Sequence, residues 1–177
     1  MSGELRARGL STGSAARSVA SSVVAAAMMV PLVGACDRDE EGGAALLQEI
    51  ESADYRNAWV RAPGWGRRLR GGSPHGTWID VYINDVMSEA IAENVPIDAW
   101  PVESQVIVEG WVTENATERE FLAVMSKPTS LDAWYWAEWG ADDALIYAGE
   151  DTAHCVRCHD AGEDEVRAFT LPPISMR

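Results

Sequence analysis

The chain has 177 residues, of which 28 are acidic and 14 are Lys or Arg, so its formal net charge is −14. This length is sufficient for one domain of ordinary size and an appended segment. The acidic balance argues against nucleic acid and anionic lipid as partners, and it suits a basic partner protein.

The first 35 residues predict a lipoprotein-type signal peptide. A polar start with three arginines leads into an apolar run over 19–33, which ends in small residues before Cys36. Such a basic region, apolar region and small-residue cleavage site form an export signal, and the run is too short for a spanning helix. Its removal leaves 11 basic against 27 acidic residues. We therefore expect the mature chain in the periplasm or elsewhere on the cell-envelope side.

Cys36 follows Val33-Gly34-Ala35, which resembles a bacterial lipobox. We predict that Cys36 becomes the first mature residue and carries lipid, so that acyl chains hold the protein on a membrane surface as its one membrane contact. An ordinary cleaved signal is the alternative. Residues 36–45 are charged and rich in Gly, which predicts a flexible tether. The domain should then occupy residues 46–177.

Hydrophobic periodicity beyond the tether predicts an α+β domain. Helical spacing indicates helices over 46–57 and 86–93. Stretches rich in β-branched and aromatic residues predict strands over 77–84, 105–113, 121–126, 131–139 and 145–148. Because polar turns separate these strands and leave little room for crossover helices, the sheet should be antiparallel.

Near the C-terminus, Cys155, Cys158 and His159 form C-x-x-C-H, the attachment signature of c-type haem. Two thiols three positions apart, most simply on one helical turn, can each form a thioether with a vinyl group of the macrocycle. His159 is then carried onto the ring face, where its imidazole can ligate the iron. We therefore predict one covalent haem c held by these three residues.

Two other chemistries use a C-x-x-C pair. Half of a zinc site would need two further thiols or imidazoles, for which the candidates are Cys36, His75 and His154. A thioredoxin-like pair begins a helix after a buried strand in a βαβ unit, whereas this pair follows Gly149-Glu150-Asp151-Thr152. Covalent c-type haem is fitted outside the cytoplasm, so the motif and the export signal support each other.

Several segments accompany the motif in a specific order: Tyr55-Arg56-x-x-Trp59, Ser73-Pro74-His75-Gly76, Val81 to Asp85, Val106 to Glu109, Val124 to Lys127, Trp134 to Trp136, and Cys155 to His159 followed by Phe169-Thr170. In this order they resemble the cytochrome P-460 family and the related c′-beta cytochromes over nearly all of the chain beyond the tether. The resemblance implies a curved antiparallel β-sheet with a few short helices, packing on one covalently bound c-type haem whose proximal ligand is His159.

The resemblance also implies a pocket on the opposite face of the iron. P-460 proteins oxidise hydroxylamine and carry a lysine joined to the macrocycle, whereas the c′-beta relatives lack this bond and bind nitric oxide or carbon monoxide. The lysine follows a V-x-V strand segment, and Glu109 is the best match here, after Val106-Ile107-Val108. Lys127, the chain's single lysine, falls on a later strand. An ordinary c-type haem is therefore expected.

Four side chains are candidates for that pocket. His75 matches a pocket aromatic of the family and is predicted to be a sixth ligand or a hydrogen-bond donor to a bound diatomic; a surface position in its Pro-His-Gly turn is the alternative. Glu109, if held over the haem, would move protons as a catalytic acid or base, and ordinary exposure is equally open. Met87 and Met125 are axial alternatives, although methionines at such positions usually pack in the core.

Two further features can serve a haem. Trp134 and Trp136 fall on one face of a predicted strand and can line the haem plane, while Tyr135 faces the other way; core packing is the alternative. The one basic loop is either solvated or an anchor for haem propionates or an acidic partner surface, and it contains Arg61, Arg67, Arg68 and Arg70. His154 is expected to be solvated.

Together these observations predict an exported mono-haem c-type cytochrome that binds a small ligand, such as nitric oxide, or carries single electrons to a redox partner protein. The alternative is an oxidoreductase acting on hydroxylamine or nitric oxide, so enzymatic activity is an open question. A haem-free metal-binding or structural lipoprotein is a third hypothesis. A homodimer is compatible with the sequence.

Overall fold

A computed structural model describes residues 39–70, 74–93, 97–131, 133–150, 152–162 and 164–167. The chain divides into two units, Met1–Val33 and Gly34–Arg177, and all of the described residues belong to the second. The predicted signal peptide, the predicted lipid site Cys36 and the segment from residue 168 onward lie outside the described residues. Export and lipidation therefore stay predictions.

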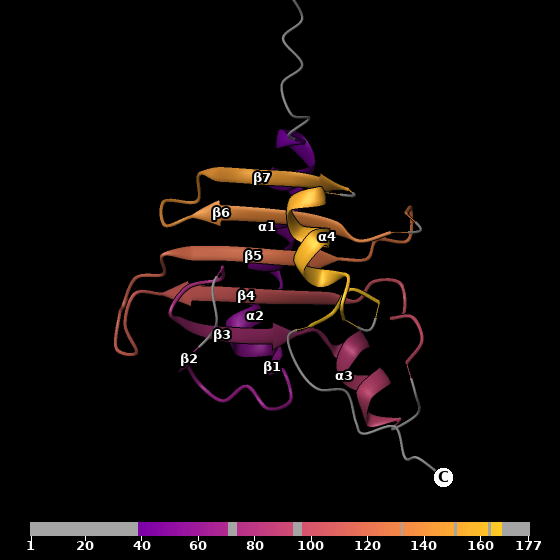
Figure 1. The fold of residues 1–177 in the computed structure, drawn as a ribbon, viewed down its shortest axis with the longest axis horizontal. Helices are drawn as coiled ribbons and strands as arrows, with labels where there is room; N and C mark the ends of the chain where they lie inside the picture. The colour runs from indigo at the N-terminus through magenta and orange to yellow at the C-terminus, as the bar shows by residue number, and fades with distance from the viewer. Residues whose placement is uncertain are drawn as a thin grey trace, which may run out of the picture. The chain divides into compact units, whose positions relative to one another are not determined.

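One antiparallel sheet organises the described chain (Figure 1). Five strands follow one another in chain order across it: β3 (Trp78–Ile83), β4 (Gln105–Trp111), β5 (Phe121–Ser126), β6 (Tyr135–Gly140) and β7 (Leu145–Glu150). Two short strands, β1 (Val60–Arg61) and β2 (Leu69–Arg70), pair with different parts of β3 at its outer edge. The predicted antiparallel α+β fold is confirmed, and the connections between consecutive strands from β4 to β7 are shorter than the crossovers that parallel strands need.

Four helices accompany the sheet in the described residues: α1 (Glu40–Ser52), α2 (Tyr55–Ala58), α3 (Asp85–Ala92) and α4 (Ala153–His159). In Figure 1, α4 lies in front of the sheet and α1 and α2 lie behind it. The side chains of the sheet alternate between these two sides, and we name the sides the α4 face and the α1 face.

The helix α1 begins earlier than predicted, so residues 40–45 are helical and the prediction of a flexible tether over them is wrong. Asp39 caps this helix by accepting a hydrogen bond from the Gly42 N–H at 2.8 Å. Gly43 is buried against β7, where a Cβ atom would come within 2.9 Å of the Ala148 Cβ. Gly43 thus allows α1 to pack closely against the sheet. From composition alone, the same glycine had indicated a flexible segment.

Two hydrophobic clusters fill the core, one on each face of the sheet. The α1 face packs Tyr82, Ile107, Leu122, Val124, Ala137 and Trp139 against Leu46, Ile50 and Tyr55. The α4 face packs Ile79, Val81, Val106, Met125, Trp134 and Trp136 with Met87, Trp100 and Val166, and α4 contributes Cys155 and Val156 to it. Trp134 and Trp136 therefore share a face while Tyr135 packs on the other, as predicted.

Candidate haem-attachment site

The two thiols of the motif stand on one short helix that packs on the α4 face. The backbone N–H groups of Cys155 and Val156 both donate to the Thr152 carbonyl at 2.9 Å, which starts α4 directly after β7. Both cysteines are free; Cys155 is half-buried and Cys158 is exposed. Residues three apart lie on one side of a helix, so the predicted arrangement of the thiols is confirmed.

The electrostatics of Cys155 differ from those of a redox-active pair. Burial raises the pKa of the Cys155 thiol, so the thiol stays protonated at neutral pH. Cysteines of thioredoxin-like motifs instead have lowered pKa values, which supply the nucleophilic thiolate. Local electrostatics therefore disfavour a thiol–disulfide exchange site at this position.

His159 ends α4 with its ring in a defined orientation. Its Nδ1 lies 2.8 Å from the backbone carbonyl oxygen of Glu165. A carbonyl only accepts, so Nδ1 carries the proton and the Nε2 lone pair is left for a metal. Burial lowers the pKa of His159, which favours this neutral form. The ring of Trp136 stands edge-on to it, with 4.8 Å between the ring centroids.

His75 lies beside His159, although 84 positions separate them in the sequence. The two ring centroids are 5.9 Å apart, and Phe121 is 5.8 Å from His75 on another side. Burial, with a smaller contribution from His159, lowers the pKa of His75 from 6.5 to about 4. Its Nδ1 is buried and has no hydrogen-bond partner. An unpaired buried polar atom of this kind costs about 1–3 kcal/mol.

Two glycines bring the His75 segment across the end of β4. Gly76 has a φ of +94°, a conformation that side chains rarely adopt. A Cβ on Gly110 would come within 2.9 Å of the His75 carbonyl oxygen, so only glycine fits beneath this turn. His75 therefore lies beside His159 and is not a fully exposed surface residue, while its role as a pocket residue stays a prediction.

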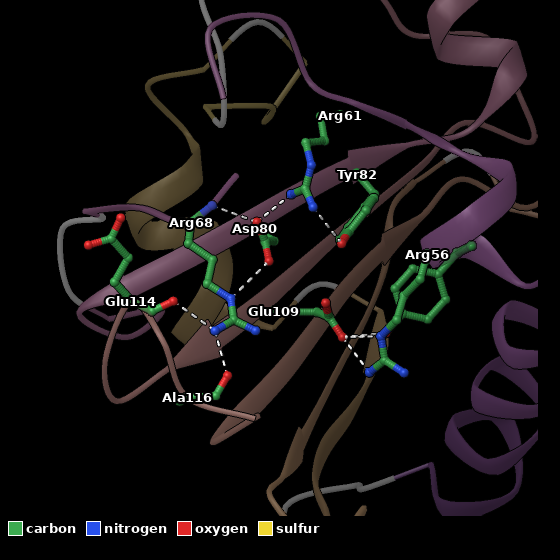
Figure 2. Close-up of polar contacts among 9 residues, drawn as sticks. Arg56, Arg61, Arg68, Asp80, Tyr82, Glu109, Glu114 and Ala116 are labelled. Carbon is green, nitrogen blue, oxygen red and sulfur yellow. Dashed lines mark hydrogen bonds and ion pairs between the residues drawn. The ribbon is translucent and has the colours of Figure 1, made fainter. Parts of the chain in front are cut away.

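Glu109 lies on the opposite side of the sheet from the motif, so its predicted role over the haem is wrong. On β4, Val106 and Val108 pack on the α4 face, whereas Ile107 packs on the α1 face together with its alternate neighbour Glu109. The alternative prediction, that the Glu109 side chain is exposed to solvent, is also wrong, because Glu109 is only 1% exposed. It accepts a hydrogen bond from the Tyr55 hydroxyl at 2.7 Å. It accepts another from Arg56 Nε at 2.8 Å (Figure 2).

The basic loop is part of the same polar cluster. Asp80 stands directly opposite Glu109 in the β3–β4 pairing and is buried. Arg61 and Arg68 both form ion pairs with Asp80 (Figure 2), and the Arg68 guanidinium lies 3.7 Å from the Trp111 ring. Since two carboxylates opposed across a strand pair repel each other, these arginines are needed within the fold. Arg67 is exposed, and the Arg70 side chain lies outside the described ones.

Glu138 is the carboxylate that β6 presents to the motif side, and the sequence interpretation missed it. It follows Trp134 and Trp136 at alternate positions and pairs with Ala123 and Tyr147 across the neighbouring strands. Burial raises the pKa of the Glu138 carboxyl, and His154 opposes this shift. The alternation that placed both tryptophans on one face would have found Glu138 two residues later.

The remaining candidates take ordinary places. Met87 and Met125 are buried in the hydrophobic cluster of the α4 face, as core methionines are. His154 is exposed, as expected. Among the residues that the structure describes, no group of three or more His, Cys, Asp and Glu side chains could hold a metal ion, and no helix is long and apolar enough to cross a membrane.

Comparison of the sequence with protein-family models and with curated proteins found no match.

Proposed function

We propose that the chain is a c-type cytochrome with one haem, attached through Cys155 and Cys158 and ligated by His159. More particularly, we propose a cytochrome related to the P-460 and c′-beta group. The support is the order of the resembling segments together with an antiparallel sheet on one face of which the motif helix packs. A bound haem would supply a redox-active iron with an axial position for a second ligand.

The observation that carries the proposal is the hydrogen bond between His159 Nδ1 and the Glu165 carbonyl. Histidines that ligate metals almost always donate their other ring N–H to such a group, which sets the tautomer and makes the ligating nitrogen more basic. The site therefore contains two thiols and one oriented imidazole, which are the donors that c-type attachment requires. The apolar side chains of the α4 face, among them Trp136, suit a large planar group.

His75 favours single-electron transfer as the activity of this site. It is a half-buried imidazole with a lowered pKa and an unpaired Nδ1, and it stands beside the proximal histidine. A neutral imidazole can occupy the second axial position of a haem iron, and iron with two histidine ligands is closed to small molecules. The mature net charge of −16 suits a basic redox partner.

A second candidate is proton-coupled chemistry on a small nitrogen oxide, hydroxylamine included. Glu138 favours it, because burial raises the pKa of this half-buried carboxyl on the motif side, so that it binds a proton more tightly than an exposed carboxyl does. In that case His75 would donate a hydrogen bond to the bound ligand and leave the axial position open.

Spectroscopy of the purified protein separates these candidates. Expression in a host that matures c-type cytochromes should give one haem per chain, which survives denaturation and shows a pyridine haemochrome with two thioethers. If the protein transfers electrons with His75 as the second iron ligand, the wild type should give a low-spin ferric signal and His75→Ala a high-spin one. The control variant is His154→Ala, which replaces an exposed histidine and should leave the signal unchanged. A high-spin wild type that binds nitric oxide would favour the second candidate, and a colourless protein with both thiols open to alkylation would refute the haem proposal.

A further inference from the structure

The carbonyl that orients His159 belongs to a strained backbone segment. Asp164 and Glu165 have φ angles of 46° and 66°, so two consecutive residues other than glycine adopt the left-handed conformation. This conformation costs free energy at each residue and persists only where the surrounding structure enforces it. The segment must therefore be held by contacts from outside it.

Asp164 receives hydrogen bonds from three distant parts of the chain. Its carboxylate accepts one from Lys127 Nζ at 2.6 Å and one from the backbone N–H of Trp100 at 2.8 Å. Its carbonyl accepts one from the indole N–H of Trp134 at 2.9 Å. Lys127 comes directly after β5, its side chain is only 12% exposed, and its ammonium also lies 5.6 Å from the Trp134 ring. Both carbonyl and carboxylate of Asp164 are thus tied to the α4-face cluster.

The residues on either side of this pair are also held. Val166 is buried in the α4-face cluster, and the Arg167 guanidinium donates to the Cys158 carbonyl at the end of α4. Gly162 passes so close to the returning chain that a Cβ would come within 2.5 Å of the Val166 carbonyl oxygen. Asp164 and Val166 are thus both held, and the Glu165 carbonyl oxygen between them lies 2.8 Å from His159 Nδ1.

We propose that Lys127 and Asp164 are positioning residues for the iron ligand: they hold the strained Asp164–Glu165 backbone so that the Glu165 carbonyl accepts the Nδ1 proton of His159. This inference rests on the proposed function, because it concerns how strongly Nε2 binds haem iron. It gives the chain's single lysine a role different from that of the cross-linking lysine in the P-460 proteins.

The hydrogen bond at Nδ1 affects the reduction potential because it changes the basicity of His159 Nε2. A strong acceptor at Nδ1 makes Nε2 a better electron donor and stabilises ferric iron. If the Glu165 carbonyl moves away, ferric iron loses this support and the reduction potential rises. Loss of such an outer partner typically weakens a metal site by about 10- to 100-fold, and a tenfold preferential weakening of the ferric state corresponds to about 59 mV for one electron.

The test compares two ion pairs of the purified holoprotein, in each of which the cationic side chain is largely buried. Lys127→Met removes the ammonium that binds Asp164, and Lys127→Arg restores a cation. Arg119→Met is the matched control, because Arg119 is 10% exposed and pairs with Asp143, another aspartate in left-handed conformation. Reduction potential and ferric electron paramagnetic resonance are the measurements, and circular dichroism verifies that each variant is folded.

We expect a rise of about 59 mV or more in Lys127→Met, recovery in Lys127→Arg, and the wild-type potential in Arg119→Met. A folded Lys127→Met protein with the wild-type potential and spectrum would overturn the inference. An equal rise in Arg119→Met would also overturn it, because general loosening of the sheet would then explain both.

A measurement without haem keeps the inference separate from the proposed function. In the haem-free chain, nitrogen NMR shifts of His159 should show the proton on Nδ1 in the wild type and in Asp143→Ala, and a mixture of tautomers in Asp164→Ala. A wild type that never binds haem refutes the proposed function, yet these shifts still decide the positioning role. An unchanged His159 tautomer in a folded Asp164→Ala chain would refute that role.

Discussion

Replacement of Glu109 by alanine tests whether this carboxylate serves stability or the haem. The side chain is 1% exposed and accepts hydrogen bonds from Tyr55, itself only 3% exposed, and from Arg56. The loss of the acceptor leaves the Tyr55 hydroxyl unsatisfied, at a cost of about 1–3 kcal/mol. The buried Cγ methylene, which alanine lacks, adds about 0.8 kcal/mol.

Two effects limit this loss. The Arg56 side chain is 49% exposed, so water replaces its lost partner and the ion pair contributes at most about 1 kcal/mol. Removal of Glu109 also relieves its repulsion with Asp80, which stands directly opposite. We therefore expect Glu109→Ala to lower the free energy of unfolding by about 3 kcal/mol, which for a domain of this size lowers Tm by about 10 °C.

The assay combines denaturation with spectroscopy. Glu109→Ala should unfold earlier in heat and urea, while its ferric spectrum and reduction potential equal those of the wild type, because the sheet separates Glu109 from α4. Glu109→Gln keeps an oxygen for Tyr55 and should lose less stability. A changed haem spectrum in a folded Glu109→Ala protein would refute the placement of this carboxylate on the α1 face.

Three further predictions concern the motif, the α4 face and α1. Cys158→Ser should abolish stable covalent haem while leaving the fold intact, because this exposed thiol is one of the two proposed anchors and packs little. A normal haem yield on a denaturing gel with haem stain would contradict the attachment scheme. Glu138 has a pKa raised by burial, so the folded state binds protons more tightly than the unfolded state and stability falls as the pH rises above about 4.5. Glu138→Gln should therefore be more stable than the wild type at pH 7 and should lose this advantage below pH 4.5 in urea titrations; a difference independent of pH would show that the group does not titrate there. Gly43→Ala should cost about 1–3 kcal/mol, because the added methyl meets Ala148 and overpacks the contact of α1 with β7, and an unchanged Tm would favour a loose N-terminal segment.

Local sequence patterns were sufficient for the elements but not for their faces. The strand over 121–126 has the predicted limits, and the other long strands differ from prediction mainly at their ends. On β4, however, Val106, Ile107, Val108 and Glu109 give no clean alternation of apolar and polar residues, because both faces of this strand are covered by helices. The sequence of this strand therefore did not indicate which of its side chains lie on the same side of the sheet as the haem motif.

The proposed attachment chemistry was predicted from the sequence alone, because Cys155, Cys158 and His159 lie within five consecutive residues and the short helix α4 brings them together. The start of α1 was not predicted, because a glycine-rich composition indicates a flexible segment. In the folded chain Gly43 instead allows α1 to pack closely against β7.

Only the tertiary structure decided which side chains surround that motif. His75, Glu138 and Lys127 are distant from it in sequence, and they meet the α4 side because strand pairing sets which residues share a face. A shift of one residue in that pairing would exchange Glu109 with Val108, so the surroundings of His159 depend on the register of the strands, which no local motif encodes.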